Sequence, residues 1–304
     1  MAKKTIVVHD GLFHCDELVA IALWLLAHPG EVFEVIRSRD PEVVINADIA
    51  IDVGGVYDPE VSRFDHHMKE VPVHAGTPIR YAACGMVWDH IKDDISHLYF
   101  GGLNVTPFYE FQDRVLAQLI LGVDACDNGQ ANSNNNEIHQ FTLSELVKTM
   151  NCSNIKSMEQ EQVFNQLVEI VKCWTDKFLK NTAQAVRDKY TVLEAANASK
   201  DGVLVLPTFC PVWKEVVLEE NLPIKLCLVD AGHGEWSITS ALKEAGSMAP
   251  LCPAPEALRG TMAGDGKFLG GCPIVFVHKA GFTGKIKANN LEAAVEACKA
   301  WING

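Results

Sequence analysis

The first third of the chain alternates short apolar segments with longer helical ones, and this order constrains the fold more than any other feature of the sequence. The segments Thr5–His9, Val32–Arg37 and Asp48–Val53 are short and rich in β-branched residues, as β-strands are. Asp16–His28 and Pro78–Lys92 have helical patterns, and a Pro-Gly pair ends the first of them. Short apolar strands separated by helices indicate βαβ units, so we predict an α/β fold with a mostly parallel N-terminal sheet.

The middle of the sequence predicts helices. Phe108–Leu121 has a helical pattern, and a long amphipathic segment at about 157–190 reads as one helix or two. The apolar positions of the long segment either pack internally or form a homodimer, and the sequence leaves both open. A polar segment with five asparagines, 128–140, predicts a loop.

A second, smaller α/β region follows. The small and polar residues Ala195–Gly202 are the best candidate boundary, so we expect two domains, 1–195 and 196–304. The second domain holds four predicted strands and a final helix: Val203–Pro207, Ile224–Val229, Glu235–Leu242, Pro273–His278 and Leu291–Trp301.

Composition excludes several classes of protein. Of the 304 residues 48% are hydrophobic and 21% are charged, which is typical of a globular chain and not of a disordered one. Twenty-six basic against 39 acidic residues give a net charge of −13, with no run of Lys and Arg. This argues against a protein that coats nucleic acid by bulk charge, but not against one that binds a few phosphates through metal ions.

Three features favour a cytoplasmic protein without a membrane anchor. The N-terminus lacks the apolar core of a signal peptide, and the longest apolar run, Leu18–Ala27, is half the length that crosses a bilayer. The ten cysteines are scattered and form no C-x-x-C pair, so we expect reduced thiols.

Histidine and aspartate gather at the predicted ends of strands. The carboxyl ends of parallel strands meet at one edge of a sheet, which is where sites form in such folds. Imidazole and carboxylate together suit Mn²⁺, Fe²⁺ or Zn²⁺. A central carboxylate with one oxygen for each ion holds two metals about 3.5–4 Å apart, and Asp52 suits this role. Three stretches of the sequence, 9–17, 48–55 and 64–67, supply the candidate ligands. These are His9, His14, Asp16, Asp52 and His66.

Each of these residues also has an ordinary structural interpretation. A single histidine is more often a hydrogen-bonded core residue, and Asp16 favours the start of a helix whether or not it binds metal. Asp52 before Gly-Gly caps a loop, and the pair His66-His67 fits a solvated turn. We favour one site over four separate coincidences at strand ends of one α/β unit.

Six motifs, in order along nearly the whole chain, resemble those of the Myg (melanocyte-proliferating-gene type) family. This family is a branch of the DHH phosphoesterase superfamily, which also includes RecJ nucleases and manganese pyrophosphatases. The matching segments are His9–Glu17 (H-D-G-L-F-H-C-D-E), Arg37–Pro41 (R-S-R-D-P), Asp48–Pro59 (D-I-A-I-D-V-G-G-V-Y-D-P), Arg63–His67 (R-F-D-H-H), Val123–Gly129 (V-D-A-C-D-N-G) and Val277–Gly284 (V-H-K-A-G-F-T-G).

The resemblance implies a DHH-like catalytic domain over residues 1–195 and a smaller substrate-binding α/β domain over 196–304. It also implies a role for each candidate residue. His67 lies near the scissile phosphate with Asp65 as its catalytic neighbour. Asp127 is preferred to Asp124 because Asp-Asn-Gly resembles the fourth acidic motif of the superfamily. The implied ligands of one ion are His9, His14 and Asp52, and those of the other are Asp16, Asp52, His66 and Asp127.

The sequence departs from the superfamily pattern in two places. His14 stands where many members carry Asp, at a spacing one residue longer. The glycine-rich substrate loop, Gly281–Gly284, continues with Lys285 where a second Gly is expected, and no Arg stands near position 289. Lysines supply point charges in place of that Arg. The candidate substrate contacts are Arg39, His278, Lys279 and Lys285; for Arg39 the alternative is a surface ion pair with Asp40 or Glu42, and for His278 a structural role.

The leading hypothesis is phosphodiester hydrolysis by a water that two divalent ions activate, with Mn²⁺ favoured over Mg²⁺, Zn²⁺ or Fe²⁺. By resemblance alone, the activity is that of a 3′–5′ exoribonuclease on single-stranded RNA or short oligonucleotides. A nucleotide or pyrophosphate hydrolase, a non-catalytic metal- and phosphate-binding module, and a metal-dependent amidohydrolase are the alternatives. Cys15 as a thiolate ligand would favour Zn²⁺.

Overall fold

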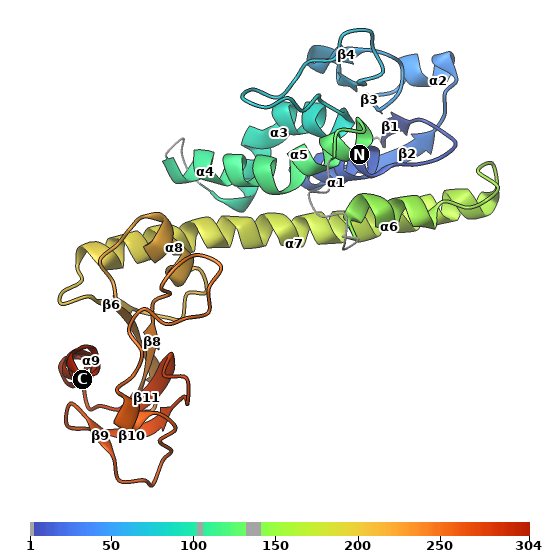
Figure 1. Ribbon diagram of the computed structural model, residues 1–304. Helices are drawn as coiled ribbons and strands as arrows, with labels where there is room; N and C mark the ends of the chain where they lie inside the picture. The colour runs from blue at the N-terminus through green and yellow to red at the C-terminus, as the bar shows by residue number, and fades with distance from the viewer. Residues whose placement is uncertain (1–2, 102–105, 132–140) are drawn as a thin grey trace. The chain divides into compact units, whose positions relative to one another are not determined.

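The computed structural model describes residues 3–101, 106–131 and 141–304, which form a mixed α/β protein with two sheets (Figure 1). The chain divides into two compact units, Met1–Gln184 and Ala185–Gly304. Helix α7 (Met158–Asn197) is continuous through this division and includes the first residues of the polar boundary segment. The division into domains 1–195 and 196–304, with a catalytic and a substrate-binding role, stays a prediction.

The sheet of the first unit is mostly parallel, as the alternation of strands and helices predicted. Strand β1 pairs in parallel with β2 and β3, and β3 pairs in parallel with β5. Only β4, at one edge, is antiparallel to its neighbour β5 among the described strands of this sheet. The order across the sheet is β2 (Phe33–Arg37), β1 (Lys4–Val8), β3 (Ile49–Ile51), β5 (Arg63–Phe64) and β4 (Tyr57–Asp58).

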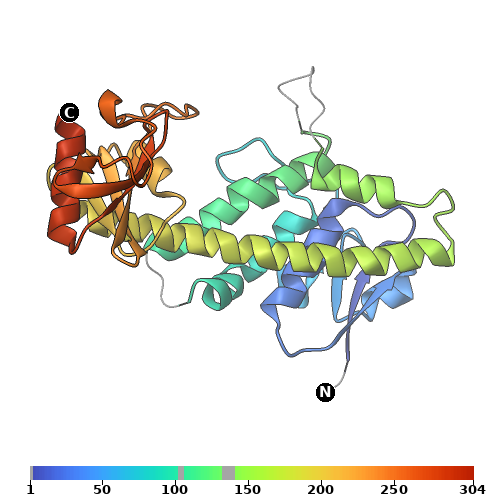
Figure 2. The ribbon, with the colours of Figure 1, turned by 90° about the horizontal axis from the view of Figure 1, so that it is seen from below.

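Helices cover this sheet because its strands are apolar on both faces. Val7 and Ala50 pack with α2 (Pro41–Ile45) through Val44, and strand side chains alternate, so Ile6 and Val8 face the other side. The side chains of helix α1 (Cys15–Ala27) are buried nearly all round, and α1 packs along α3. Figures 1 and 2 show how the helices of this unit lie against the sheet. The remaining helices are α3 (Ala83–Tyr99), α4 (Thr106–Val115), the π-helical turn η2 (Leu116–Ile120), α5 (Leu121–Asp127) and α6 (Leu143–Met150), with a 3₁₀ turn, η1 (Pro59–Val61).

Two helical predictions need correction or sharpening. The helix predicted at Pro78–Lys92 is wrong at its start, because it begins at Ala83 and ends at Tyr99. The residues before Ala83 are non-helical because their backbone groups form hydrogen bonds with side chains that follow α5. For example, the Arg80 N–H donates to the Gln130 side chain. The long segment forms one helix, α7, rather than two. Residues 132–140 of the predicted asparagine-rich loop lie outside the described residues.

The second unit has a mixed sheet between two helical layers. Within β6, Val203 packs with the cluster around α9 and Leu204 with the cluster around α8, as the two-residue period of a strand requires. Strands β6 and β7 are parallel, and the other neighbours are antiparallel. The order is β6 (Val203–Leu206), β7 (Leu226–Gly232), β8 (Glu235–Ser240), β11 (Thr283–Lys287), β10 (Cys272–Val277) and β9 (Phe268–Leu269), with helices α8 (Trp213–Glu219) and α9 (Leu291–Asn303) and the turn η3 (Glu256–Leu258).

The glycine-rich loop expected at Gly281–Gly284 is half strand, and this expectation is therefore corrected. Thr283 and Gly284 belong to β11, which pairs with β8 and β10. A Cβ atom on Gly284 would lie 2.8 Å from the Phe276 carbonyl oxygen and 3.1 Å from the Trp301 ring. Gly284 is thus required by packing within the sheet and against α9.

No helix among the described residues combines the length and the apolar character that a membrane span needs.

Candidate metal centre

Three neighbouring strands deliver candidate ligands to the same edge of the first sheet. His9 follows β1, Asp52 follows β3, and His66 lies two residues beyond β5. Because these strands are parallel and adjacent, their carboxyl ends lie side by side. These three side chains therefore lie close together at this edge of the sheet, as the sequence predicted.

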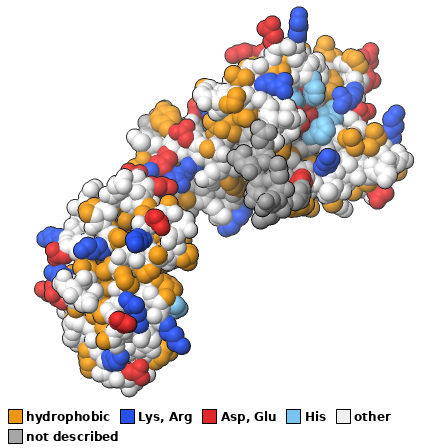
Figure 3. Space-filling view, in the orientation of Figure 1, with side chains coloured by type: hydrophobic (Ala, Val, Ile, Leu, Met, Phe, Trp, Pro, Cys, Tyr) orange, Lys and Arg blue, Asp and Glu red, His pale blue; other side chains and the backbone are white. Residues whose placement is uncertain are grey.

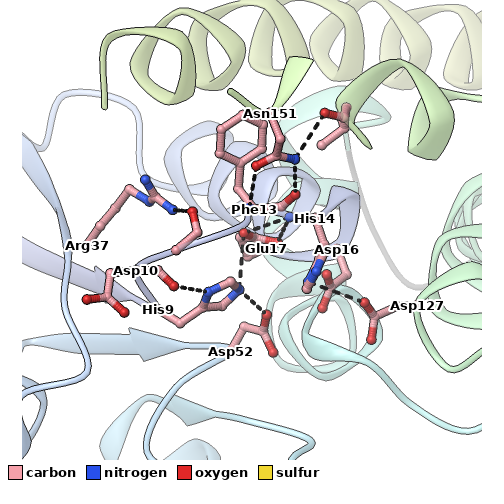
Figure 4. A network of polar contacts seen from close by, with 12 residues as sticks. His9, Asp10, Phe13, His14, Asp16, Glu17, Arg37, Asp52, Asp127 and Asn151 are labelled. Atoms are coloured by element: carbon pink, nitrogen blue, oxygen red, sulfur yellow. Dashed lines mark hydrogen bonds and ion pairs between the residues drawn. The ribbon is translucent and has the colours of Figure 1, made fainter. Parts of the chain in front are cut away.

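Helices α1 and α5 bring the remaining ligands. His14 is the N-cap of α1, and its N–H donates to both carboxylate oxygens of Glu17 at 2.9 Å. Asp16 lies in the first turn of the same helix, fully buried. Asp127 is the last residue of α5. Figure 4 shows His9, His14, Asp16, Asp52 and Asp127 turned toward one another.

His9 is the centre of the first group of contacts. Its Nε2 lies 3.1 Å from Asp52 Oδ2 and 3.3 Å from Glu17 Oε1 (Figure 4). Its Nδ1 lies 3.0 Å from the Asp10 carbonyl oxygen and donates to it, since a carbonyl only accepts. With Nδ1–H given to Asp10, Nε2 faces two carboxylates, an arrangement that needs either a proton on Nε2 or a cation between these atoms.

His66 is the centre of the second group. Its Nε2 lies 3.1 Å from Asp127 Oδ2, 3.3 Å from Asp52 Oδ1 and 3.9 Å from Asp16 Oδ2. His14 also lies near Asp127, and the distance from its Nδ1 to Asp127 Oδ1 is 3.8 Å.

Asp52 is shared between the two groups. Its Oδ2 faces His9, and its Oδ1 faces His66. Its backbone has φ of 55°, a left-handed conformation that costs free energy in a residue other than glycine, while its N–H donates to the Phe64 carbonyl oxygen at 2.9 Å. This hydrogen bond helps to hold the conformation, in which the Asp52 carboxylate lies between His9 and His66.

Several buried polar atoms of this site make no hydrogen bond among the described residues, although they lie close together. Burying such atoms without a partner is costly, and a divalent cation bound to imidazole nitrogen and carboxylate oxygen removes that cost. The donor set therefore fits divalent cations. The unpartnered atoms are His9 Nε2, both carboxylate oxygens of Asp16 and of Asp52, and His66 Nε2. Three groups have ligand atoms within 4.8 Å of one another: His9, His14, Glu17 and Asp52; Asp52, His66 and His67; and His14, Asp16 and Asp127.

The electrostatics of these residues follow from the same crowding. Burial and the neighbouring Asp52 raise the pKa of Asp16 well above its usual range. Burial alone would lower the pKa of His9, but Asp52 and Glu17 outweigh it and raise the pKa to about 10. For His66 the same balance, with Asp127 and Asp52 as the facing carboxylates, raises the pKa to about 9. Without a cation the site therefore holds protons.

His67 and Asp65 form a pair at the exposed side of the centre. The His67 ring donates from Nδ1 to Asp65 Oδ1 at 2.9 Å and lies 3.3 Å from Asp52 Oδ1. These two carboxylates raise the pKa of His67 to about 10. The His67 side chain is 57% exposed, and the His14 side chain is 49% exposed. Figure 3 shows histidine side chains gathered at the surface of the first unit.

The structure places Asp127, and not Asp124, among the candidate ligands. Asp124 is fully buried and accepts hydrogen bonds from His74 Nε2 at 2.7 Å and from Gly85 N–H at 3.0 Å. Both of its carboxylate oxygens are therefore used. Neither this pair nor Glu17 was predicted from the sequence. The signal for Glu17 was its place three residues after the N-cap, which is the pattern of a capping box.

The predicted substrate contacts are exposed or already paired. Arg39 forms an exposed ion pair with Asp10 at 3.3 Å, instead of the partners Asp40 or Glu42 considered as its alternative. In the second unit, Lys285 lies 3.3 Å from Glu235 on β8, and Lys279 is exposed.

Two further predictions concern single side chains. The His278 ring is 4.3 Å from that of Phe282, and its Nδ1 accepts from Ala280 N–H. Burial raises the pKa of the Cys15 thiol to about 12, and Cys15 is in none of the groups of facing ligand atoms found among the described residues.

Comparison with known proteins agrees with the family that the motifs indicated, and it does not test the link to the DHH superfamily. Residues 5–302 match the model of the MYG1 exonuclease family, described as "Uncharacterised protein family (UPF0160)". The protein of Mus musculus named MYG1 exonuclease is 28% identical over 317 residues, which cover 93% of this chain and 81% of that protein. The Homo sapiens protein of the same name is also 28% identical, over 93% of this chain and 82% of its own length. The MYG1 protein of Saccharomyces cerevisiae is 26% identical over 98% of this chain and 95% of its own. The match over nearly the whole sequence shows that the chain belongs to the MYG1 exonuclease family.

Proposed function

We propose that this chain is a metal-dependent phosphodiester hydrolase of DHH-like architecture that shortens single-stranded RNA or short oligonucleotides from the 3′ end. The observation that carries the proposal is the set of buried, unpartnered atoms of His9, Asp16, Asp52 and His66 at one edge of the sheet. Relatives named MYG1 exonuclease support a nucleic acid as the substrate. The preference for RNA and for the 3′ end comes from the resemblance of the motifs.

We propose two Mn²⁺ ions, with the ligands divided between them as the resemblance implies, and one contact supports this division. Asp52 is the shared ligand, because its two oxygens face different histidines. The cations, when bound, lower the pKa of an attacking water and neutralise charge on the phosphate. The proposed ligands of one ion are His9, His14 and Asp52, and those of the other are Asp16, Asp52, His66 and Asp127.

His67 acts on the substrate phosphate. In the metal-free chain Asp52 and Asp65 raise the pKa of His67 to about 10. When Asp52 binds cations, the hydrogen bond from Nδ1–H to Asp65 is the contact that still favours the imidazolium. Its Nε2–H is then available to donate to a phosphate oxygen and to stabilise charge on the leaving oxygen. Asp65 keeps the ring in this orientation, and it is itself held because it accepts from the N–H groups of Gly55 and His67.

The net charge of −13 fits a short or single strand that enters by one end better than a duplex lying along the surface. Arg39, His278, Lys279 and Lys285 stay candidate substrate contacts. The ion pairs of Arg39 with Asp10 and of Lys285 with Glu235 must open or be shared if these two bind phosphate.

The test uses the purified full chain, loaded with Mn²⁺, and single-stranded RNA labelled at the 5′ end. We expect a ladder of products that shorten stepwise, and the same RNA labelled at the 3′ end should release labelled mononucleotide at once. A chelator should stop both. The variant His67→Gln should bind Mn²⁺ normally and hydrolyse RNA about 10²–10³-fold more slowly.

Two results would overturn this proposal. RNA that stays intact while pyrophosphate or a dinucleotide is hydrolysed quickly would assign the chain to small phosphate esters. No hydrolysis of any phosphate ester, with Mn²⁺ bound, would favour the non-catalytic module.

A further inference from the structure

The loop between β1 and α1, residues 9–14, carries one candidate ligand at each end. His9 opens it and His14 closes it, so the position of both rings depends on how the backbone between them is held. Gly11 in this loop has φ of 94°, and Phe13 is fully buried. Neither residue has a side chain that can bind a metal ion. The conformation of the loop therefore depends on contacts with other parts of the molecule.

Asn151 holds the backbone of Phe13 on both its polar groups. The Phe13 N–H donates to Asn151 Oδ1 at 3.0 Å, and Asn151 Nδ2 donates to the Phe13 carbonyl oxygen at 2.9 Å. Asn151 is the C-cap of α6 and stands 138 residues away in the sequence. A primary amide is suited to this role because it offers an acceptor and a donor in one plane.

Gln160, in the first turn of α7, extends the same network and is fully buried. Its Nε2 donates to the Gly11 carbonyl oxygen at 2.9 Å and to Asn151 Oδ1 at 2.7 Å. Its Oε1 accepts from Cys152 N–H at 2.8 Å. The two amides therefore join the ligand-bearing loop to the connection between α6 and α7.

Arg37 supports the loop from the end of β2. Its Nη2 donates to the Gly11 carbonyl oxygen at 2.7 Å, and its Nη1 lies 2.7 Å from Glu161. The guanidinium also lies over the Phe164 ring of α7, 4.7 Å from its centroid. Figure 4 shows Arg37 and Asn151 reaching the loop from different sides.

We propose that Asn151 and Gln160 are positioning residues of the metal centre. They fix His9 and His14 through the backbone of residues 11–13, and they couple cation binding to the docking of the connection between α6 and α7. The inference rests on the proposed binding of cations by these histidines. Such coupling is reciprocal: what weakens the amide network weakens cation binding, and a bound cation stabilises the network.

The first test measures the dissociation constant of Mn²⁺ alone for the full chain by titration calorimetry. Asn151→Ala should raise it about 10–100-fold, the range typical when a group that orients a metal ligand is lost. The matched control is Asn46→Ala, which removes an amide-to-backbone hydrogen bond within α2, to the Glu42 carbonyl oxygen. It should leave the constant within about twofold. Equal Mn²⁺ binding by Asn151→Ala and the unsubstituted chain would overturn the inference.

A double-mutant cycle separates positioning from a general loss of structure. If Asn151 acts through the loop, its substitution should weaken Mn²⁺ binding much less in a His14→Ala background than in the unsubstituted one. Equal effects in both backgrounds would contradict this route.

Hydrogen exchange of the unsubstituted chain tests the coupling without any substitution. Bound Mn²⁺ should slow exchange in peptides that cover residues 10–14 and 151–153 and leave α2 unchanged. Bound Mn²⁺ with no change at 151–153 would refute the coupling. A chain that takes up no Mn²⁺ at all would remove the proposed function, and this inference with it.

Discussion

Two neighbourhoods of histidine and aspartate lie in the first unit, and they differ in how their polar atoms are satisfied. In the first, His9, His66 and Asp52 bring buried nitrogen and oxygen atoms within about 3 Å, yet these atoms make no hydrogen bond among the described residues. In the second, both oxygens of Asp124 are used, one by His74 and one by the Gly85 N–H. Residue type is the same in both; the presence of partners is not.

This difference separates a binding site from a structural pair. A buried carboxylate with two donors contributes to the fold and has no capacity left for a ligand. Buried carboxylates that face one another and neutral imidazoles are destabilising until a cation or protons enter. The first neighbourhood is therefore costly in the free chain and suited to a metal, whereas the second holds α5 against α3.

The largest contrast should come from removing one carboxylate in each neighbourhood. Asp52→Asn replaces one of the two shared oxygen atoms by an amide nitrogen and removes the negative charge, so we expect Mn²⁺ binding to be lost and hydrolysis to fall by on the order of 10³-fold or more. Asp124→Asn should keep Mn²⁺ bound and lower the free energy of unfolding instead. Metal analysis of both purified variants, with urea unfolding, checks this. Retention of two equivalents of Mn²⁺ by Asp52→Asn would erase the distinction between the neighbourhoods.

The structural pair can be disrupted from its backbone side. A Cβ atom on Gly85 would overlap Asp124 Oδ2 and lie 2.8 Å from the His74 ring, and both of these residues are buried. We expect Gly85→Ala to lower the free energy of unfolding by about 3 kcal/mol, because neither neighbour has room to move. Gly122→Ala, on α5 with open space around it, is the matched control and should change stability little. A stable Gly85→Ala protein would show that the pair tolerates rearrangement.

The metal neighbourhood should make the stability of the metal-free chain depend on pH. The pKa values of His9 and His66, about 10 and about 9, lie above the usual 6.5. Their stabilising contribution is therefore complete below about pH 6.5 and is lost as the pH rises through 9 to 10. Urea unfolding with a chelator present should show a decline of a few kcal/mol from pH 7 to pH 10. His9→Gln should make the decline shallower; an identical slope would mean that the carboxylates do not hold these protons.

The first neighbourhood could be predicted from the sequence because its members lie at the ends of strands. His9 and Asp52 follow apolar segments that are recognisable alone, and the parallel pairing of β1 with β3 brings them together. The role of Glu17 was harder to see, because a capping pattern explains that residue without any metal. Asn151 could not be anticipated: its contact with Phe13 spans 138 residues and depends on where α6 ends.

The helix boundary at Ala83 shows the same limit on a smaller scale. Local propensity extends the helix back to Pro78. Nothing near that position indicates that the side chains of Gln130 and Asn128 form hydrogen bonds with the backbone of residues 78–81. The second neighbourhood depends on this non-helical segment, since His74 and Tyr81 lie in or beside it. Interactions between segments distant in the sequence therefore determine where this helix begins, which the local pattern does not.

The smallest predicted effect concerns the outer side of the structural pair. The Tyr81 ring stacks on His74, with centroids 3.7 Å apart, and its hydroxyl donates to Asp89. Tyr81→Phe keeps the stacking and removes one hydrogen bond to a charged acceptor, so we expect the free energy of unfolding to fall by about 1–2 kcal/mol. The Mn²⁺ dissociation constant should not change, because Tyr81 reaches the cation site only through a pair whose atoms are already satisfied. A tenfold weaker Mn²⁺ complex in this variant would show that the two neighbourhoods are coupled, and that the satisfied pair also positions Asp127 on α5.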